Sequence, residues 1–499
     1  MSVAANIAKG MIWLVSGRLG NALLSLASTA VLARLLAPGD FGVMAAAWIV
    51  IALANVLFDG AFGQNLLRKR SARPEDVRTT LTMGLLVAGL LVLMVAGLAP
   101  GIETFFAFPH LAGVLTVSAL VIPCKAVFAV ATSQLQLQGR FGVMAAGTLV
   151  AAFIGNFLVG IPLGLLGYGV WALVAAAVVT GAAEAALLAV NARMPVLPLL
   201  ERKAMREVFG AGFFSLANIM NWAANTGSNA VVGRVMGDVS LGLYSRGWKL
   251  LDLFVAATAT PLSRVLLPSF AKLREDRDRL SAALIDVLGL VLPAYAVASV
   301  LLTLHAPWIV AIVLGSKWVG TIPVAQVMFA TVLPRCAVKV SENFAVANGR
   351  ARSTATRQGL YAVLMIGGTL LGTHWGVLGV AIAASVAICI FYLVSMRYAT
   401  GLGQVSLATS VQLHCRALAF AALIGAADGA MLWLLSGQGM AIRHPVAGLA
   451  GMLAGIRIAT WSPDFWFGKR NAAKLLAALT ATRARMPGFL RYREQNYGS

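Results

Sequence analysis

The chain has 499 residues, of which 60% are hydrophobic and only 11% are charged. An ordinary globular domain carries about 25% charged residues, and a soluble chain of this length would contain polar linkers between several domains. The composition therefore excludes an ordinary soluble protein. Apolar runs of about 20 residues, the length that a helix needs to cross a bilayer, recur along the chain and predict an all-α polytopic membrane protein.

The net charge of +21 is concentrated in alternate connections between the apolar runs. Basic residues crowd the stretches 68–78, 272–279 and 350–357, whereas the other connections hold little beyond Lys317 and Arg443. Because Lys and Arg accumulate in cytoplasmic loops, this alternation predicts that both termini are cytoplasmic. A charge that follows membrane topology is weak evidence for nucleic-acid binding, and we expect no nucleic-acid partner.

We expect fourteen transmembrane helices. The first follows a single Lys9 and precedes no cleavage site, so it is predicted to be an uncleaved span. The last is short and contains Gly451 and Gly455, which also fits a re-entrant segment. The longer outer connections are predicted at 101–110 and 306–320. The expected helices cover residues 11–36, 41–63, 79–99, 111–133, 143–166, 169–192, 208–236, 241–268, 284–304, 321–347, 359–374, 376–397, 416–436 and 445–461.

Two stretches of the chain are similar at an offset of 200 residues. ARLLAPGDFGVM, which begins at Ala33, aligns with GRVMGDVSLGLY, which begins at Gly233, and the alignment matches Gly42 with Gly242. Transporters built from such repeats bind their substrates between the two halves. We therefore expect two six-helix lobes, two additional helices and a basic cytoplasmic tail. These regions span residues 1–196, 197–405, 406–462 and 463–499.

Charged residues inside the expected helices indicate a functional site, because a charge facing lipid at mid-bilayer costs about 2.5–3.5 kcal/mol. Cations exceed carboxylates among them by about three charges, which predicts a wet cavity that binds an anion. The expected cavity cations are Arg246, Lys249, Arg335, Lys339 and Lys125. The carboxylates expected to bind a coupling ion or to pair with these cations are Asp59, Asp252, Glu342 and Glu184.

Structural roles remain open for some of these side chains. Arg335, Lys339 and Glu342, at i, i+4 and i+7, also fit an ion-pair network within one helix, and Asp59 also fits a helix cap. The face of the first repeat that matches the cationic helix at 241–268 has no cations. We therefore expect the helices at 241–268 and 321–347 to build most of the anion site.

The sequence has none of the catalytic motifs that we considered. It contains no GxxxxGK[ST], HExxH or GxSxG run, and we expect no cofactor, no metal site and no enzyme activity. The four cysteines have no metal-binding spacing and are expected to pack in the helices. Arg34 and Arg234 are expected to snorkel to the outer interface. The histidines lie near the ends of the expected helices and predict interfacial packing, at His110, His305, His374, His414 and His444.

Three longer stretches provide a separate line of evidence. They are LARLLAPGDFGVMAAAWIVIALANVLFDGAFGQNLLRKR at Leu32–Arg70, LGLYSRGWKLLDLF…RDRL at Leu241–Leu280 and GSKWVGTIPVAQVMF at Gly315–Phe329. They resemble the polysaccharide-exporter branch of the MOP superfamily, which includes the Wzx-type flippases. The resemblance implies two six-helix lobes in a V, and alternating access that moves an undecaprenyl-diphosphate-linked oligosaccharide across the bacterial inner membrane.

The resemblance also implies partners. The substrate would be a lipid-linked oligosaccharide, and other polysaccharide-assembly proteins would act beside this chain. The basic tail is expected to contact anionic lipid headgroups. Two other functions stay open: a cation-coupled multidrug exporter of the same fold, which would present acidic residues to its substrates, and a membrane ligase or polymerase, which would need a larger outer loop.

Overall fold

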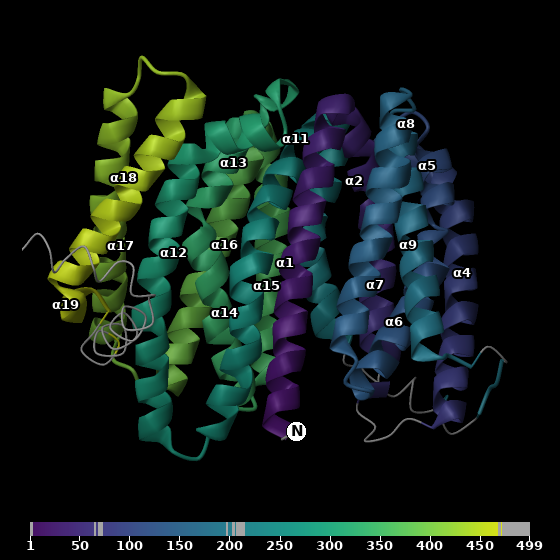
Figure 1. Cartoon of the computed structure of the whole chain (residues 1–499), viewed down its shortest axis with the longest axis horizontal. Coiled ribbons are helices and arrows are strands. Elements are labelled where there is room, and N and C mark those ends of the chain that lie inside the picture. The colour runs from purple at the N-terminus through teal and green to yellow at the C-terminus, as the bar shows by residue number, and fades with distance from the viewer. Residues whose placement is uncertain are drawn as a thin grey trace, which may run out of the picture. The chain divides into compact units, whose positions relative to one another are not determined.

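The computed structural model describes residues 3–63, 66–67, 73–195, 198–201, 205, 215–467 and 471, and every regular element in these ranges is helical (Figure 1). The basic residues Arg68–Arg70 and the cations of the predicted tail beyond residue 467 lie outside the described residues. Their expected roles at the membrane surface stay predictions.

The first part of the chain contains ten described elements. They are α1 (Val3–Leu35), α2 (Pro38–Leu57), the π-helix η1 (Phe58–Gly63), α4 (Pro74–Phe106), α5 (Leu111–Ser118), α6 (Val121–Leu137), α7 (Phe141–Phe153), the π-helix η2 (Ile154–Gly160), α8 (Ile161–Leu165) and α9 (Val170–Ala192).

The remaining elements begin after the gap at residues 206–214. They are α11 (Ser215–Lys272), α12 (Arg277–Val313), the short 3₁₀ helix η4 (Ser316–Trp318), α13 (Thr321–Ala330), α14 (Val332–Ala347), α15 (Ala351–Gly372), the 3₁₀ helix η5 (Thr373–Trp375), α16 (Gly376–Leu402), α17 (Leu407–Leu434), α18 (Met440–Trp461) and α19 (Pro463–Phe467).

Nine helices in the described part of the chain are long and apolar enough to cross a membrane, or ten if the bent pair of α13 and α14 is one span. Two of the nine segments are 51 residues long, more than twice the ~20 residues that one crossing needs. One contains a break at Gly237, whose φ of 87° lies in the left-handed region that favours glycine. The other is interrupted by η5, and both breaks fall between predicted helices.

Two helices extend beyond their predicted ends. α4 continues through Pro100 to Phe106, and α12 continues to Val313. The outer connections are therefore shorter than the predicted 101–110 and 306–320. The composition of these stretches indicated loops because Pro and Gly usually end helices, but a helix near the bilayer surface can include them when the surroundings satisfy its backbone.

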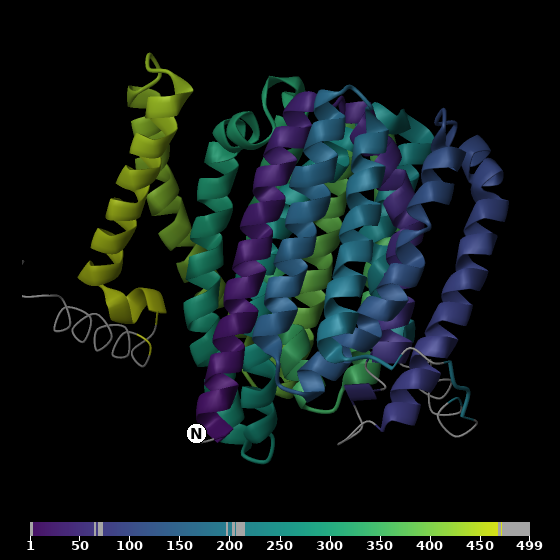
Figure 2. The same cartoon turned by 45° about the vertical axis from the view of Figure 1, so that its right-hand side comes forward.

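The chain divides into two compact units. The first contains residues 1–264, 306–331 and 350–394, and the second contains residues 265–305, 332–349 and 395–499. Within the second unit α17 and α18 lie side by side in both views (Figures 1 and 2). Within the first unit α4 exposes Leu86, Leu90 and Leu93, each more than 60% accessible. This apolar surface is what a helix facing lipid presents.

The corner between α1 and α2 packs reciprocally against the break in α11. A Cβ atom on Gly42 would overlap the backbone of Asp238, and a Cβ atom on Gly242 would overlap the backbone of Pro38. The two glycines are 200 residues apart, and so are Pro38 and Asp238, which is the offset of the predicted repeat. Each copy therefore contributes one glycine and one backbone contact. This is the packing that a two-fold related pair produces, although the two six-helix lobes stay a prediction.

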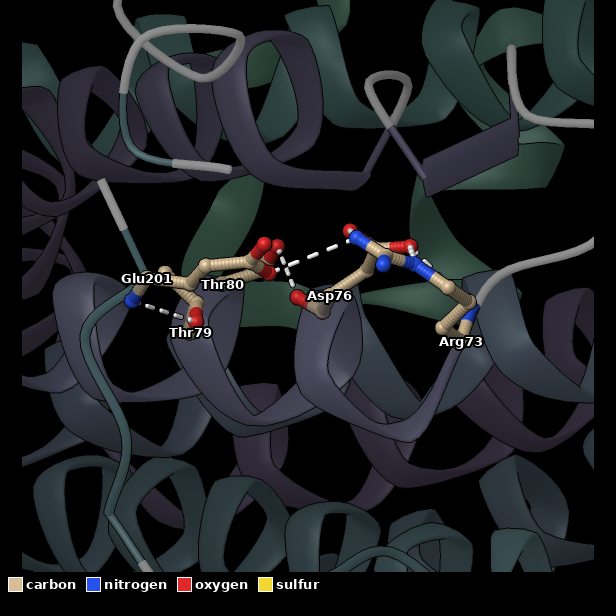
Figure 3. A network of polar contacts seen from close by, with 5 residues as sticks. All are labelled: Arg73, Asp76, Thr79, Thr80 and Glu201. Carbon is tan, nitrogen blue, oxygen red and sulfur yellow. Dashed lines mark hydrogen bonds and ion pairs between the residues drawn. The ribbon is translucent and has the colours of Figure 1, made fainter. Parts of the chain in front are cut away.

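A polar network holds the start of α4 (Figure 3). Asp76 accepts a hydrogen bond from the backbone nitrogen of Arg73 at 3.1 Å and caps the helix. The Arg73 guanidinium also lies 3.3 Å from the carboxylate of Glu201, whose own backbone nitrogen donates to Thr79. The hydrogen bond to the Asp76 carboxylate, with the nearby carboxylate of Glu201, raises the pKa of Arg73.

Candidate functional site

The first unit contains a cavity of about 600 Å³. Its walls come from α1, α2, α6, η2, α9 and α11. Four of the charged residues expected at the site line it together: Lys125 on α6 and Arg246, Lys249 and Asp252 on α11. The structure therefore brings three of the five expected cations into one cavity.

Arg246 is held by an aromatic ring rather than by a carboxylate. Its guanidinium lies over Phe41 of α2, 4.7 Å from the ring centroid. Its Nε is buried and has no hydrogen-bond partner among the described residues. A cation over an aromatic face keeps its charge and its N–H donors, so Arg246 retains hydrogen-bonding capacity for an anion.

Lys249 follows Arg246 by three residues, so both side chains lie on neighbouring positions of the same helix face. No ion pair of either cation is found within the described ranges, and Asp252, the next residue in this series, is exposed at the cavity. Two adjacent cations with one nearby carboxylate leave a positive region inside an apolar bundle. Such a region is stabilised when an anion enters it.

Lys125 does have a partner. Its Nζ lies 3.1 Å from Oε2 of Glu184 on α9, and the carboxylate is buried. The sequence interpretation counted about three unpaired cations and left Lys125 among them. The ion pair lowers the excess in this cavity to one positive charge, from three cations and two carboxylates.

The rest of the cavity wall combines aromatic rings with small polar side chains. Trp48 and Trp248 supply the rings, and Asn156 of the π-helix η2 supplies an amide. Two buried polar atoms of the wall, Thr180 Oγ1 and Asn229 Oδ1, have no hydrogen-bond partner within the described chain. Unsatisfied buried polar groups are rare in proteins and call for water or a ligand. Aromatic walls with a few placed polar groups are typical of a ligand-binding pocket.

One end of this unit is held by contacts that we call the latch, formed by Ala33, Arg34, Leu35, Lys317 and Trp318. The Trp318 indole donates to the carbonyl oxygen of Ala33 at 2.8 Å, and the Lys317 ammonium donates to that of Arg34 at 3.0 Å. These carbonyls end α1, where the last turn lacks partners within the helix. The latch therefore caps α1 with side chains that lie more than 280 residues away.

Arg34, which was expected to snorkel to the interface, is exposed near the end of α1. Its Nη2 donates to the carbonyl oxygen of Ile312 at 2.5 Å, and its position relative to a membrane stays a prediction. This carbonyl lies in the last turn of α12, so Arg34 joins the end of α1 to the end of α12. Arg234, its counterpart in the repeat, is exposed and lies over Phe105, 5.4 Å from the ring centroid.

The remaining expected site residues lie elsewhere. Arg335 and Glu342 are buried and Lys339 is exposed on α14, which belongs to the second unit. They do not line the cavity, and their part in binding or ion coupling stays a prediction. Asp59 lies in η1, and its side chain is outside the described residues.

Another cation of α11 was missed by the sequence interpretation. Arg264 lines a second cavity of about 660 Å³ in the first unit, together with Gln136, Thr132 and Ser133. The signal that found Arg246 and Lys249, a charge inside an apolar run, also marks Arg264. Arg264 lies inside the predicted helix at 241–268, but it was not named among the expected site residues.

The sequence is similar to proteins of bacterial polysaccharide synthesis. It is 25% identical over 283 residues to the succinoglycan biosynthesis transport protein ExoT of Rhizobium meliloti, covering 56% of this chain and 57% of that protein. It is 24% identical over 322 residues to the lipopolysaccharide biosynthesis protein WzxC of Escherichia coli, covering 61% of this chain and 62% of that protein. The chain thus matches less than two thirds of the length of each.

Solved structures share the fold. The lipid II flippase MurJ, in an inward closed conformation, superposes with a TM-score of 0.72 at 15% identity and covers 91% of this chain and 99% of its own. An inward-facing multidrug resistance MATE family transporter of the MOP superfamily gives 0.61 at 13% identity, over 79% of this chain and 99% of its own. The profile of the polysaccharide biosynthesis protein family matches residues 31–323, more than half of the chain. The chain therefore belongs to the polysaccharide biosynthesis protein family.

Proposed function

We propose that this protein is a flippase that moves a lipid-linked oligosaccharide from the inner to the outer leaflet of a bacterial inner membrane. The observation that carries the proposal is the cavity beside Arg246 and Lys249, two neighbouring cations without an ion-pair partner in the described chain. A diphosphate between the lipid and the sugar supplies the anion that such a site stabilises. The rings and polar groups of the wall then contact the sugar.

The relatives support this substrate class. ExoT and WzxC are named for succinoglycan transport and lipopolysaccharide biosynthesis, and both products are polysaccharides. A net positive cavity disfavours the alternative of a multidrug exporter for cationic drugs, because like charges would repel inside a low-dielectric wall.

The proposed topology has fourteen crossings. Each 51-residue segment crosses twice, on either side of its break, and α1, α18 and the bent pair of α13 and α14 each cross once. Two lobes, at residues 1–196 and 197–405, then alternate in opening the cavity to each side, with both termini in the cytoplasm. The latch closes the outer end in this arrangement.

The membrane potential contributes to the direction of transport. Moving one elementary charge across the membrane is worth about 2.3 kcal/mol per 100 mV. A diphosphate with two negative charges therefore gains about 5 kcal/mol per 100 mV when it leaves an interior-negative cell. The substrate's charge would drive export, and the expected carboxylates Asp59, Asp252, Glu342 and Glu184 would serve to pair charges or to return the empty carrier.

The test uses proteoliposomes that contain the purified protein and a fluorescent undecaprenyl-diphosphate oligosaccharide. Hydrogen bonds to charged groups contribute about 1.5–3 kcal/mol, so Arg246→Gln and Lys249→Gln should each slow flipping about tenfold or more. Matched controls are Arg234→Gln and Lys272→Gln, which remove exposed cations elsewhere on the same helix. Wild-type rates for both cavity variants, in folded protein, would refute the cationic site.

A further inference from the structure

A buried cluster of three titratable side chains lies in the second unit, outside the cationic cavity. His305 comes from α12, Asp428 from α17 and His444 from α18. Their exposed fractions are 9%, 0% and 6%. Ionisable groups inside a membrane bundle are costly and mark functional sites, and the sequence interpretation had assigned both histidines to interfacial packing.

The three side chains form a hydrogen-bonded chain. Nε2 of His305 lies 3.2 Å from Oδ1 of Asp428, and Nδ1 of His305 lies 2.9 Å from Nδ1 of His444. Two facing ring nitrogens can share only one hydrogen, because one must donate and the other must accept. With the carboxylate ionised and both rings neutral, His444 donates to His305, His305 donates to Asp428, and every contact is satisfied at a net charge of −1.

This chain can gain one proton without losing a contact. Oδ2 of Asp428 is buried and has no hydrogen-bond partner among the described residues, so it can carry the proton. The cluster then becomes neutral, which removes a buried negative charge whose desolvation is expensive.

A positively charged side chain next to His444 also affects which protonation state the cluster adopts. Arg443 is the neighbouring residue on α18 and interacts electrostatically with His444, and its Nε donates to the carbonyl oxygen of Leu432 on α17. Its positive charge disfavours a positively charged ring at His444. Oδ2 of Asp428 is therefore the position that the geometry offers for one added proton.

Two glycines of α18 make the cluster compact. A Cβ atom on Gly451 would lie 3.1 Å from Oδ1 of Asp428, and one on Gly448 would lie 3.4 Å from Nε2 of His305. His444 is the fifth residue of α18, so with a rise of about 1.5 Å per residue it lies about 6 Å along the axis from the helix start. His444 therefore lies near the N-terminal end of α18.

We propose that His305, Asp428 and His444 bind a single exchangeable proton and that its occupancy sets the pH dependence of transport. The second part rests on the proposed flippase activity. The first part does not, because proton binding is measured without substrate. The site lies on the α17–α18 hairpin and α12, so proton occupancy changes the polar attachment of the hairpin within the second unit.

Proton binding is tested on the purified full-length chain between pH 5 and 8, the range in which histidines exchange protons. Infrared difference spectra report a protonated carboxyl group, and NMR of ¹³C-labelled histidine reports the rings. We expect one coupled transition in the wild-type protein, and loss of it in Asp428→Asn. In His305→Gln the signal of His444 should shift, whereas the exposed His374→Gln should change only its own signal.

The same pH range is then scanned for flipping in proteoliposomes. The wild-type rate should show a step that Asp428→Asn lacks, whereas Arg246→Gln should slow flipping at every pH. No transition in the carboxyl or ring signals of the wild-type protein overturns the proton site, and this measurement needs no folded variant. If the wild-type protein shows the transition but Asp428→Asn flips substrate with the wild-type pH profile, the cluster has no role in transport. Absence of wild-type flipping would instead refute the proposed function.

Discussion

The guanidinium of Arg246 lies over the ring of Phe41, 4.7 Å from its centroid. The same ring packs edge-on against Trp318 of the latch, with centroids 5.2 Å apart and an interplanar angle of 75°. Phe41 therefore contacts the cavity through Arg246 and the latch through Trp318. A change at one place can reach the other through a single rigid side chain.

Replacing this ring tests the connection. Phe41→Leu keeps an apolar side chain but removes the cation–π contact, which is worth about 0.5–2 kcal/mol, and the edge contact with Trp318. We expect weaker binding of a diphosphate-linked substrate. In a Lys317→Cys background we also expect greater access of water-soluble thiol reagents to that position. Phe105→Leu removes the ring beneath the exposed Arg234 and serves as the matched control. Unchanged binding and unchanged access in Phe41→Leu would contradict the connection.

The reciprocal glycines predict a second result. In Gly42→Val the new side chain would overlap the backbone of Asp238, and overpacking of this kind costs about 1–3 kcal/mol. Since backbone cannot move aside as a flexible side chain does, the α2 and α11 corners must separate. Thermal unfolding should begin at a lower temperature, and flipping should be lost if the latch end can no longer close.

The control for this substitution lies on α4. Gly89 has no atom within 4 Å of its Cβ position, so Gly89→Val adds the same side chain without overlap. It should unfold at the wild-type temperature. Equal midpoints for the two variants would show that the corner accommodates a side chain and would remove the steric argument.

The ion pair between Lys125 and Glu184 predicts a third result. Glu184→Gln leaves the Lys125 ammonium without its partner in a partly buried position, and loss of a hydrogen bond to a charged group costs about 1.5–3 kcal/mol. The double variant Lys125→Gln with Glu184→Gln removes both charges and should recover part of this stability. Thermal denaturation of the wild type, of Lys125→Gln, of Glu184→Gln and of the double variant gives the coupling energy between the two side chains.

The flipping rates of the same proteins distinguish a role of Lys125 in substrate binding from a role in stability. If Lys125 contributes to the anion site, the double variant should remain slow even where its stability recovers. If the pair only stabilises the packing of α6 against α9, the rate and the melting temperature should recover together.

The sequence by itself determined the membrane class, because apolar runs long enough to cross a bilayer need no knowledge of neighbours. It also located the breaks near Gly237 and Trp375, since the local composition there cannot continue a helix. It predicted that Arg246, Lys249 and Asp252 avoid lipid, because the cost of a charge in hydrocarbon depends on the side chain and its depth, and the structure places all three in the lining of one cavity.

Only the tertiary structure decided which of these charges meet. Lys125 and Glu184 are 59 residues apart, and their pairing depends on how α6 packs against α9. Asp428 meets His305 and His444 only because three helices converge. The two histidines lie near predicted helix ends and gave no sign of this cluster, whereas Asp428 is a charge inside the predicted helix at 416–436 and was not named. Helical periodicity reports which residues share a face, whereas the distance between faces depends on packing between helices, which is set by the fold as a whole.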